Sequence, residues 1–143
     1  MSFTWEPFGP SRREGPDAQP APLSREPAQA LAVLTCMDCR IDALGALGLE
    51  LGDAVVLRNG GAAWTEDVAR SLQLSRGLGV KRVHVLGHTD CAARGGDDQA
   101  AEAAARGTAE AIRAAIPELE VSAGFLDLRT GVSRPAAAPP PSG

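Results

Sequence analysis

The sequence predicts a small α/β domain with a mostly parallel β-sheet and helices on its faces. Residues 30–35 form a continuous apolar run, as is typical of a strand that is covered on both sides, and Val83, Val85 and Leu86 indicate a second buried strand at residues 82–87. Segments with helical periodicity alternate with these strands, which favours parallel pairing. The 143 residues leave room for one such domain.

The first half of the domain is expected to contain two strands. Residues 30–35 (Ala-Leu-Ala-Val-Leu-Thr) predict the first strand, and the short apolar, glycine-interrupted segment 43–49 predicts a helical turn. Residues 54–57 predict the second strand. The sequence Arg-Asn-Gly-Gly follows at residues 58–61, where the glycines indicate a tight turn.

The second half is expected to contain two helices and two strands. A helix capped by Thr65 should run to about Leu78, followed by a third strand at residues 82–87. An alanine-rich helix should extend from about Asp97 to Ile116, because Pro117 cannot continue it. Residues 124–129 predict the last strand.

The two ends of the chain are not expected to add to the core. Residues 1–28 are rich in proline and polar groups, and we interpret them as a disordered or partner-embracing arm. Residues 135–143 are rich in proline and alanine and predict a disordered tail. The folded domain is therefore expected at residues 29–134, and so small a unit favours self-association.

Charge and hydropathy exclude several classes of protein. The formal net charge is −4, and the basic residues do not form the cluster that a phosphate backbone requires, so nucleic acid is not an expected partner. No apolar run is long enough for a membrane span, and we expect a cytoplasmic protein. Three cysteines are an odd number for a disulfide framework and favour metal or redox chemistry.

Metal-ligand residues follow the first and third predicted strands. Cys36 comes directly after the first strand, and His88 and Cys91 follow the third. If these strands are neighbours, their carboxyl ends bring the three side chains together. Two thiolates and a neutral imidazole suit Zn²⁺ and leave one tetrahedral position open.

Asp38 and Arg40 lie beside this expected site. In an extended backbone, Cys36, Asp38 and Arg40 would point to the same side. Asp38 could fill the fourth position on the metal, or a water could fill it while Arg40 holds the carboxylate in a bidentate pair.

Three motifs together resemble a known family. Cys-Met-Asp-Cys-Arg at residues 36–40, Arg-Asn-Gly-Gly at 58–61 and His-Thr-Asp-Cys at 88–91 are similar to the motifs of short bacterial β-class carbonic anhydrases. The resemblance implies that Cys36, His88 and Cys91 bind zinc. Asp38 is expected as a further ligand only in a closed resting state, since this carboxylate has both the metal and Arg40 as available partners. The resemblance also implies that Asp38 and Arg40 are catalytic, with Asp38 accepting a hydrogen bond from the zinc-bound hydroxide that attacks CO₂ to give bicarbonate.

The resemblance further implies a homodimer or higher homo-oligomer with the active-site cleft between subunits. The chain departs from the family pattern at Ala92, where glycine is usual, and in a short C-terminal half. Two alternatives therefore stay open: a zinc hydrolase of a CO₂ analogue such as COS or CS₂, and a catalytically weak zinc-binding homologue. A redox dithiol of Cys36 and Cys39 is a third hypothesis, although it does not explain His88 and Cys91.

Several other residues have a structural interpretation beside a functional one. Cys39 is expected to be a small buried hydrophobe, and His84 a strand histidine with a local partner instead of a proton shuttle. Arg58 is expected to be a scaffold for the site. Asp90 is interpreted as a turn cap and Arg94 as a solvated charge.

Overall fold

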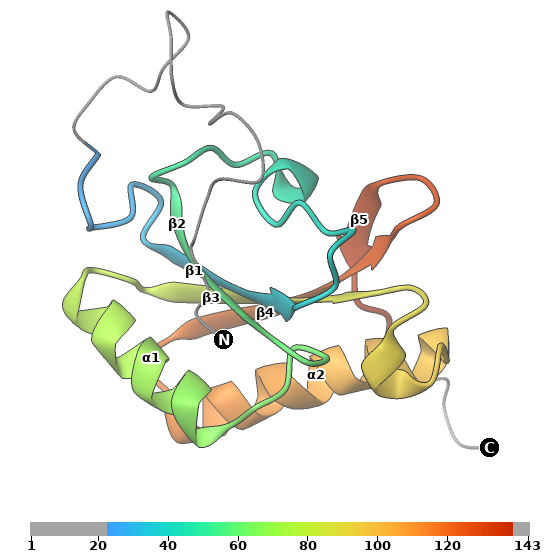
Figure 1. Cartoon of the computed structure of the whole chain (residues 1–143). Helices are drawn as coiled ribbons and strands as arrows, with labels where there is room; N and C mark the ends of the chain where they lie inside the picture. Colours follow the sequence, from blue (N-terminus) through green and yellow to red (C-terminus); the bar gives the residue numbers. More distant parts are fainter. Residues whose placement is uncertain (1–22, 139–143) are drawn as a thin grey trace, which may run out of the picture.

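The computed structural model describes residues 23–138, which form one five-stranded sheet with two α-helices (Figure 1). The sheet order is β2-β1-β3-β4-β5, in which the first four strands are parallel and β5 is antiparallel to β4. The elements in chain order are β1 (Leu31–Cys36), η1 (Gly45–Leu47), β2 (Ala54–Asn59), α1 (Glu66–Gly77), β3 (Arg82–His88), η2 (Ala92–Arg94), α2 (Asp98–Ala115), β4 (Glu120–Asp127) and β5 (Val132–Pro135). The predicted α/β class with a mostly parallel sheet is confirmed.

Both α-helices pack on the same face of the sheet, whereas the sequence predicted helices on its faces in general (Figure 1). Val68 and Leu72 of α1 and Ile112 of α2 belong to one buried cluster with the strand residues on that side. The strand residues of this cluster are Ala32, Leu34, Val83, Val85 and Val121. The small side chains of α2, such as Ala105 and Ala109, let this helix approach the sheet closely.

The helices begin where the sequence predicted them to begin. The Thr65 hydroxyl accepts a hydrogen bond from the Val68 N–H at 3.1 Å, and the Asp97 carboxylate accepts one from the Ala100 N–H at 3.0 Å. Each cap satisfies a backbone donor that has no partner inside its helix. Within residues 23–138, no helix combines the length and the apolar character that crossing a membrane would require.

The central pairing of β1 with β3 determines where the functional side chains meet. The two strands are parallel, and Thr35 lies opposite Leu86 in their register. The Thr35 hydroxyl donates a hydrogen bond to the Leu86 carbonyl at 2.9 Å, which joins the strands near their carboxyl ends. The residues that follow both strands therefore share one edge of the sheet.

The C-terminal part of the domain differs from the sequence prediction. β4 begins at Glu120, four residues before the predicted strand, and β5 occupies a segment for which no strand was predicted. Pro135, expected to begin a disordered tail, pairs with Gly124 in β5, and the tail from residue 139 lies outside the described residues. The four residues of β5 are mostly exposed and show no apolar pattern that would predict a strand, and Arg134 of β5 forms an ion pair with Glu102 of α2.

The N-terminal arm was predicted over residues 1–28, of which residues 1–22 lie outside the described part. The part that is described approaches β2, because the Ala28 N–H donates a hydrogen bond to the Gly52 carbonyl at 2.8 Å.

Candidate metal centre

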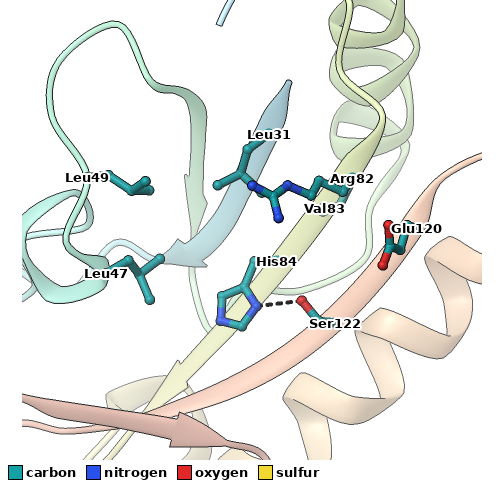
Figure 2. Close-up of a pocket in the computed structure, with 8 residues that line it drawn as sticks. All are labelled: Leu31, Leu47, Leu49, Arg82, Val83, His84, Glu120 and Ser122. Atoms are coloured by element: carbon teal, nitrogen blue, oxygen red, sulfur yellow. Dashed lines mark hydrogen bonds between the residues drawn. The ribbon is translucent and has the colours of Figure 1, made fainter. Parts of the chain in front are cut away.

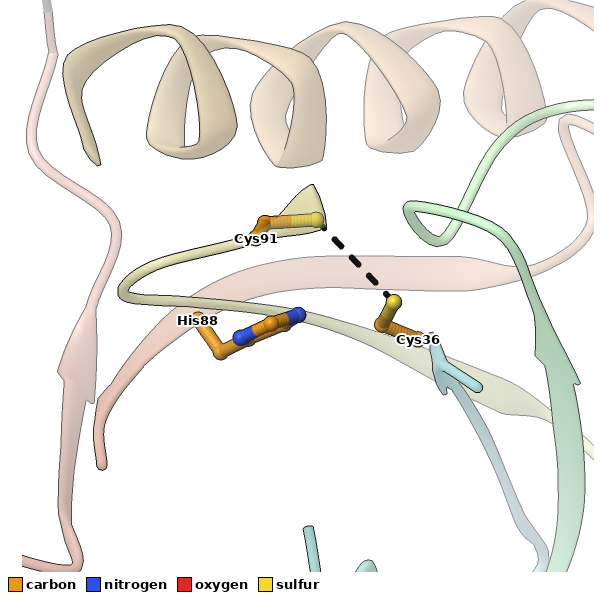
Figure 3. Close-up of side chains that lie close together, drawn as sticks. All are labelled: Cys36, His88 and Cys91. Carbon is orange, nitrogen blue, oxygen red and sulfur yellow. Dashed lines mark hydrogen bonds between the residues drawn. The ribbon is translucent and has the colours of Figure 1, made fainter. Parts of the chain in front are cut away.

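Three buried side chains converge at the carboxyl ends of β1 and β3 (Figure 3). Cys36 is the last residue of β1, His88 is the last residue of β3, and Cys91 follows in the turn before η2. Their ligand atoms all lie within 4.8 Å of one another, and the two sulfur atoms are 4.0 Å apart. Two sulfurs on one tetrahedral Zn²⁺ at about 2.3 Å each lie about 3.8 Å apart, so the spacing suits the metal.

His88 has a nitrogen that is free for a metal. Its Nδ1 lies 2.7 Å from the Thr89 carbonyl oxygen, an acceptor, so Nδ1 carries the proton. Its Nε2 is buried without a hydrogen-bond partner among the described residues. An unpaired buried acceptor is costly, and a cation beside two thiolates would remove that cost. The donor set therefore fits zinc.

The two sulfurs have different surroundings. The Gly61 N–H donates a hydrogen bond to the Cys36 Sγ at 3.3 Å. Burial raises the pKa of the Cys91 thiol, and the backbone N–H groups of Ala93 and Arg94 partly offset this effect. A metal at this position would compete with the proton on Cys91.

Asp38 and Arg40 form a bidentate ion pair beside the three ligands. Arg40 Nε donates to Asp38 Oδ1 at 3.0 Å, and Arg40 Nη2 donates to Asp38 Oδ2 at 2.7 Å. These hydrogen bonds hold the pKa of Asp38 far below its usual range, so the carboxylate is ionised. The sequence predicted that Asp38 and Arg40 lie on the same side because they belong to an extended strand. The two side chains do meet, but the predicted cause is wrong: β1 ends at Cys36, and a turn brings them together.

Arg58 holds the loop that carries Asp38. Its guanidinium donates to the carbonyl oxygens of Cys36, Asp38 and Ile41 at 2.8, 2.7 and 3.1 Å. Three bonds from one side chain bind the 36–41 loop to β2. The expectation that Arg58 is a scaffold is confirmed by these contacts.

The protein resembles known carbonic anhydrases over most of its folded part. The family model described as carbonic anhydrase matches residues 31–127, which include every residue of the site described above. The chain belongs to the β-carbonic anhydrase family.

Named relatives agree with the family assignment. Beta-carbonic anhydrase 1 of Mycobacterium tuberculosis is 45% identical over 71 residues, which are 49% of this chain and 44% of the relative. Carbon disulfide hydrolase of Saccharolobus solfataricus is 44% identical over 62 residues, or 43% of this chain and 30% of that protein. The matched region is thus less than half the length of these curated relatives. The crystal structure of carbonic anhydrase from Streptococcus mutans superposes with a TM-score of 0.74 at 30% identity, covering 82% of this chain and 87% of that one.

Other predicted residues of this family member differ from expectation. Cys39 is exposed, so its interpretation as a buried hydrophobe is wrong, and it lies outside the cluster of Cys36, His88 and Cys91. Arg94 is not a solvated charge, because it is half-buried and donates to the Gly61 carbonyl at 3.3 Å. The sequence indicated only a glycine turn at Gly61. No pattern in the sequence predicted that the Gly61 N–H donates to the sulfur of Cys36.

His84 has the local partner that the sequence favoured. Its Nδ1 lies 2.7 Å from the Ser122 Oγ, on the face of the sheet opposite the helices (Figure 2). Both residues line a cavity of about 300 Å³ near the amino ends of the strands, with Leu47 and Leu49 on its other side. Burial lowers the pKa of His84. This cavity is at the opposite end of the strands from the metal-ligand cluster.

Proposed function

We propose that this chain binds one Zn²⁺ through Cys36, His88 and Cys91 and catalyses the reversible hydration of carbon dioxide to bicarbonate. The observation that carries the proposal is the His88 side chain, whose buried Nε2 has no hydrogen-bond partner among the described residues and which lies in one cluster with the sulfurs of Cys36 and Cys91. An ionised Asp38 lies beside this cluster. Membership of the β-carbonic anhydrase family supports the same reaction.

In this proposal each residue has a separate task. Zinc, when bound, lowers the pKa of a coordinated water towards neutrality and so supplies a nucleophile. Asp38 would accept a hydrogen bond there and orient the attacking oxygen, and Arg40 keeps the Asp38 carboxylate ionised. In a closed resting state, Asp38 would leave Arg40 and would be a further residue that holds the metal.

A zinc hydrolase of CS₂ or COS is the second candidate. The similarity to carbon disulfide hydrolase, 44% identical over 62 residues, favours it. CO₂, CS₂ and COS are all linear molecules with an electrophilic carbon. The same donor set would therefore serve the hydration of CO₂ and the hydrolysis of CS₂ or COS. A catalytically weak zinc-binding homologue is the third candidate, motivated by Ala92 after the last ligand.

A homodimer or larger homo-oligomer is part of the proposal. Met37, which lies between Cys36 and Asp38 in the 36–41 loop, is 70% exposed, and Val132 of β5 is 63% exposed. Burying such side chains against a second copy would be favourable. A reducing compartment such as the cytoplasm would keep the metal-binding thiols available.

The first experiment is the zinc content of the purified protein combined with stopped-flow CO₂ hydration. We expect about one zinc per chain and turnover that Asp38→Ala reduces by at least tenfold while zinc is retained. Zinc without CO₂ turnover, followed by hydrolysis of CS₂ or COS, would favour the second candidate. Zinc with neither activity would favour the third, and no zinc would contradict all three.

A further inference from the structure

Arg40 is held by a second acidic residue in addition to Asp38. Its Nη1 donates to the Asp90 Oδ2 at 3.2 Å, and its Nη2 donates to the Asp90 backbone carbonyl at 3.0 Å. One guanidinium therefore lies between two carboxylates that come from different parts of the chain, the loop after β1 and the turn after β3. The sequence suggested only a turn cap for Asp90.

Asp90 is held in an unusual backbone conformation. Its φ is +52°, in the left-handed region that few residues other than glycine, asparagine and aspartate adopt. Its N–H donates to the Asp98 carboxylate at 2.9 Å, at the start of α2. The preceding Thr89 is hydrogen-bonded to residues at and just after the end of β4. Its N–H donates to the Leu126 carbonyl, and its hydroxyl accepts from the Leu128 N–H. Neighbouring elements thus keep Asp90 against Arg40.

The two carboxylates share a single positive charge. Asp38 is 12% exposed and Asp90 is 75% exposed, so Asp38 forms the stronger bonds. If Asp38 moved away, Asp90 would still be a partner for Arg40. Two negative groups on one cation also repel each other, which weakens the attachment of Asp38. Both effects make it easier for Asp38 to leave Arg40.

We propose that Asp90 is a positioning residue that sets how firmly Arg40 competes with the metal for Asp38. The proposal rests on the zinc-dependent function proposed above. Without the Asp90 charge, Arg40 should hold Asp38 more tightly, and the metal should lose part of the contribution that Asp38 makes as a ligand in the closed state.

The test is a double-mutant cycle on zinc affinity. Zn²⁺ binding is measured by competition with a chromophoric chelator, at one pH and ionic strength, for the wild type, Asp90→Asn, Asp38→Ala and the double variant. Asparagine tolerates the left-handed backbone, so Asp90→Asn removes the charge and keeps the turn. If Asp38→Ala does not fold, Asp38→Asn takes its place.

We expect Asp90→Asn to weaken zinc affinity about three- to tenfold in the wild type and to have less than half of that effect, on a logarithmic scale, when Asp38 is absent. Equal weakening in both backgrounds would mean that the Asp90 charge acts on the metal directly, and it would overturn the proposal. No change in the wild type would overturn it as well. If the wild-type protein did not bind zinc, the result would contradict the proposed function and this inference together.

The chain contains a matched control. Asp127 and Arg129 form a second bidentate pair of the same sequence spacing at the end of β4, with Nε–Oδ1 and Nη2–Oδ2 distances of 3.1 and 3.2 Å. Asp127→Asn removes one negative charge from an equivalent pair and should leave zinc affinity within about twofold of the wild type. A loss as large as that of Asp90→Asn would show a general charge effect and would count against the proposal.

Discussion

The N–H of Gly61 donates a hydrogen bond to the sulfur of Cys36 at 3.3 Å, which connects the turn after β2 to a proposed zinc ligand. The turn is fixed by the side chain of Asn59, which bonds both the N–H and the carbonyl of Ala63 at 2.8 and 2.9 Å. Arg94 binds the Gly61 carbonyl from the other side. The turn is therefore a supporting element of the metal centre.

Gly61→Ala should disturb both folding and the metal centre. Its φ of +82° disfavours a side chain by about 1–2 kcal/mol. A Cβ there would lie 3.0 Å from the Ala93 Cβ and 3.1 Å from the Arg94 Nη2, so either these neighbours or the turn that donates to Cys36 must move by a few tenths of an ångström. We expect a lower unfolding free energy and zinc affinity reduced severalfold, measured by urea unfolding and chelator competition.

Gly79→Ala is the matched control for this change. Gly79 has a φ of +94°, but an added Cβ would meet no atom within 4 Å. Gly79→Ala should lower the unfolding free energy by an amount similar to that of Gly61→Ala and should leave zinc affinity unchanged. Equal zinc affinities for both variants would show that the contact with Cys36 has no effect on the metal.

Arg58→Lys should destabilise the 36–41 loop. Lysine has one ammonium group and cannot reach the Cys36, Asp38 and Ile41 carbonyls with the planar geometry of arginine. Leaving one of these carbonyls without a partner costs about 1–3 kcal/mol. We expect lower stability and a reduced CO₂ hydration rate, whereas Arg70→Lys on the exposed face of α1 should change neither.

Glu102 should make stability depend on pH. Its ion pair with Arg134 lowers the pKa of Glu102, and its bond to the Ala137 N–H adds to this. Because the folded-state pKa lies below the unfolded value of about 4.3, the stabilisation is present above that pH and is lost as the pH falls through the folded-state pKa. The difference in unfolding free energy between wild type and Glu102→Gln should therefore be present at pH 6 and shrink at acidic pH.

A control for that measurement is Glu110→Gln, which removes an exposed carboxylate from the same helix. It reports the effect of losing one negative charge. A difference for Glu102→Gln that stays constant from pH 6 to strongly acidic pH would contradict the role of the ion pair with Arg134.

Removal of zinc should lower the thermal stability of the protein. A ligand that binds only the folded state raises the unfolding temperature by mass action, and the cluster of Cys36, His88 and Cys91 is buried. We expect the unfolding temperature to fall after treatment with a chelator and to recover on addition of Zn²⁺. Cys91→Ser should abolish the recovery; a full recovery in that variant would contradict the assignment of Cys91 as a ligand.

The sequence alone predicted the parts of this protein that depend on local pattern. Apolar residues predicted β1 and β3, the Thr65 cap predicted the start of α1, and an alanine-rich stretch from about Asp97 predicted α2. Ligand residues after two strands predicted the cluster of Cys36, His88 and Cys91. These predictions succeeded because parallel neighbours bring their carboxyl ends to one edge. The family followed from the order and spacing of three short motifs.

Only the tertiary structure determined the contacts between distant segments. The bond from Gly61 to Cys36 joins residues 25 positions apart in the chain, and the contact of Asp90 with Arg40 joins residues 50 apart. The pairing of β5 with β4 joins residues 5 to 11 positions apart. No local pattern encodes them, since a glycine, an aspartate and a short polar strand each suit many environments. The packing of the β3–η2 turn and of α2 against the sheet decides which environment each one receives.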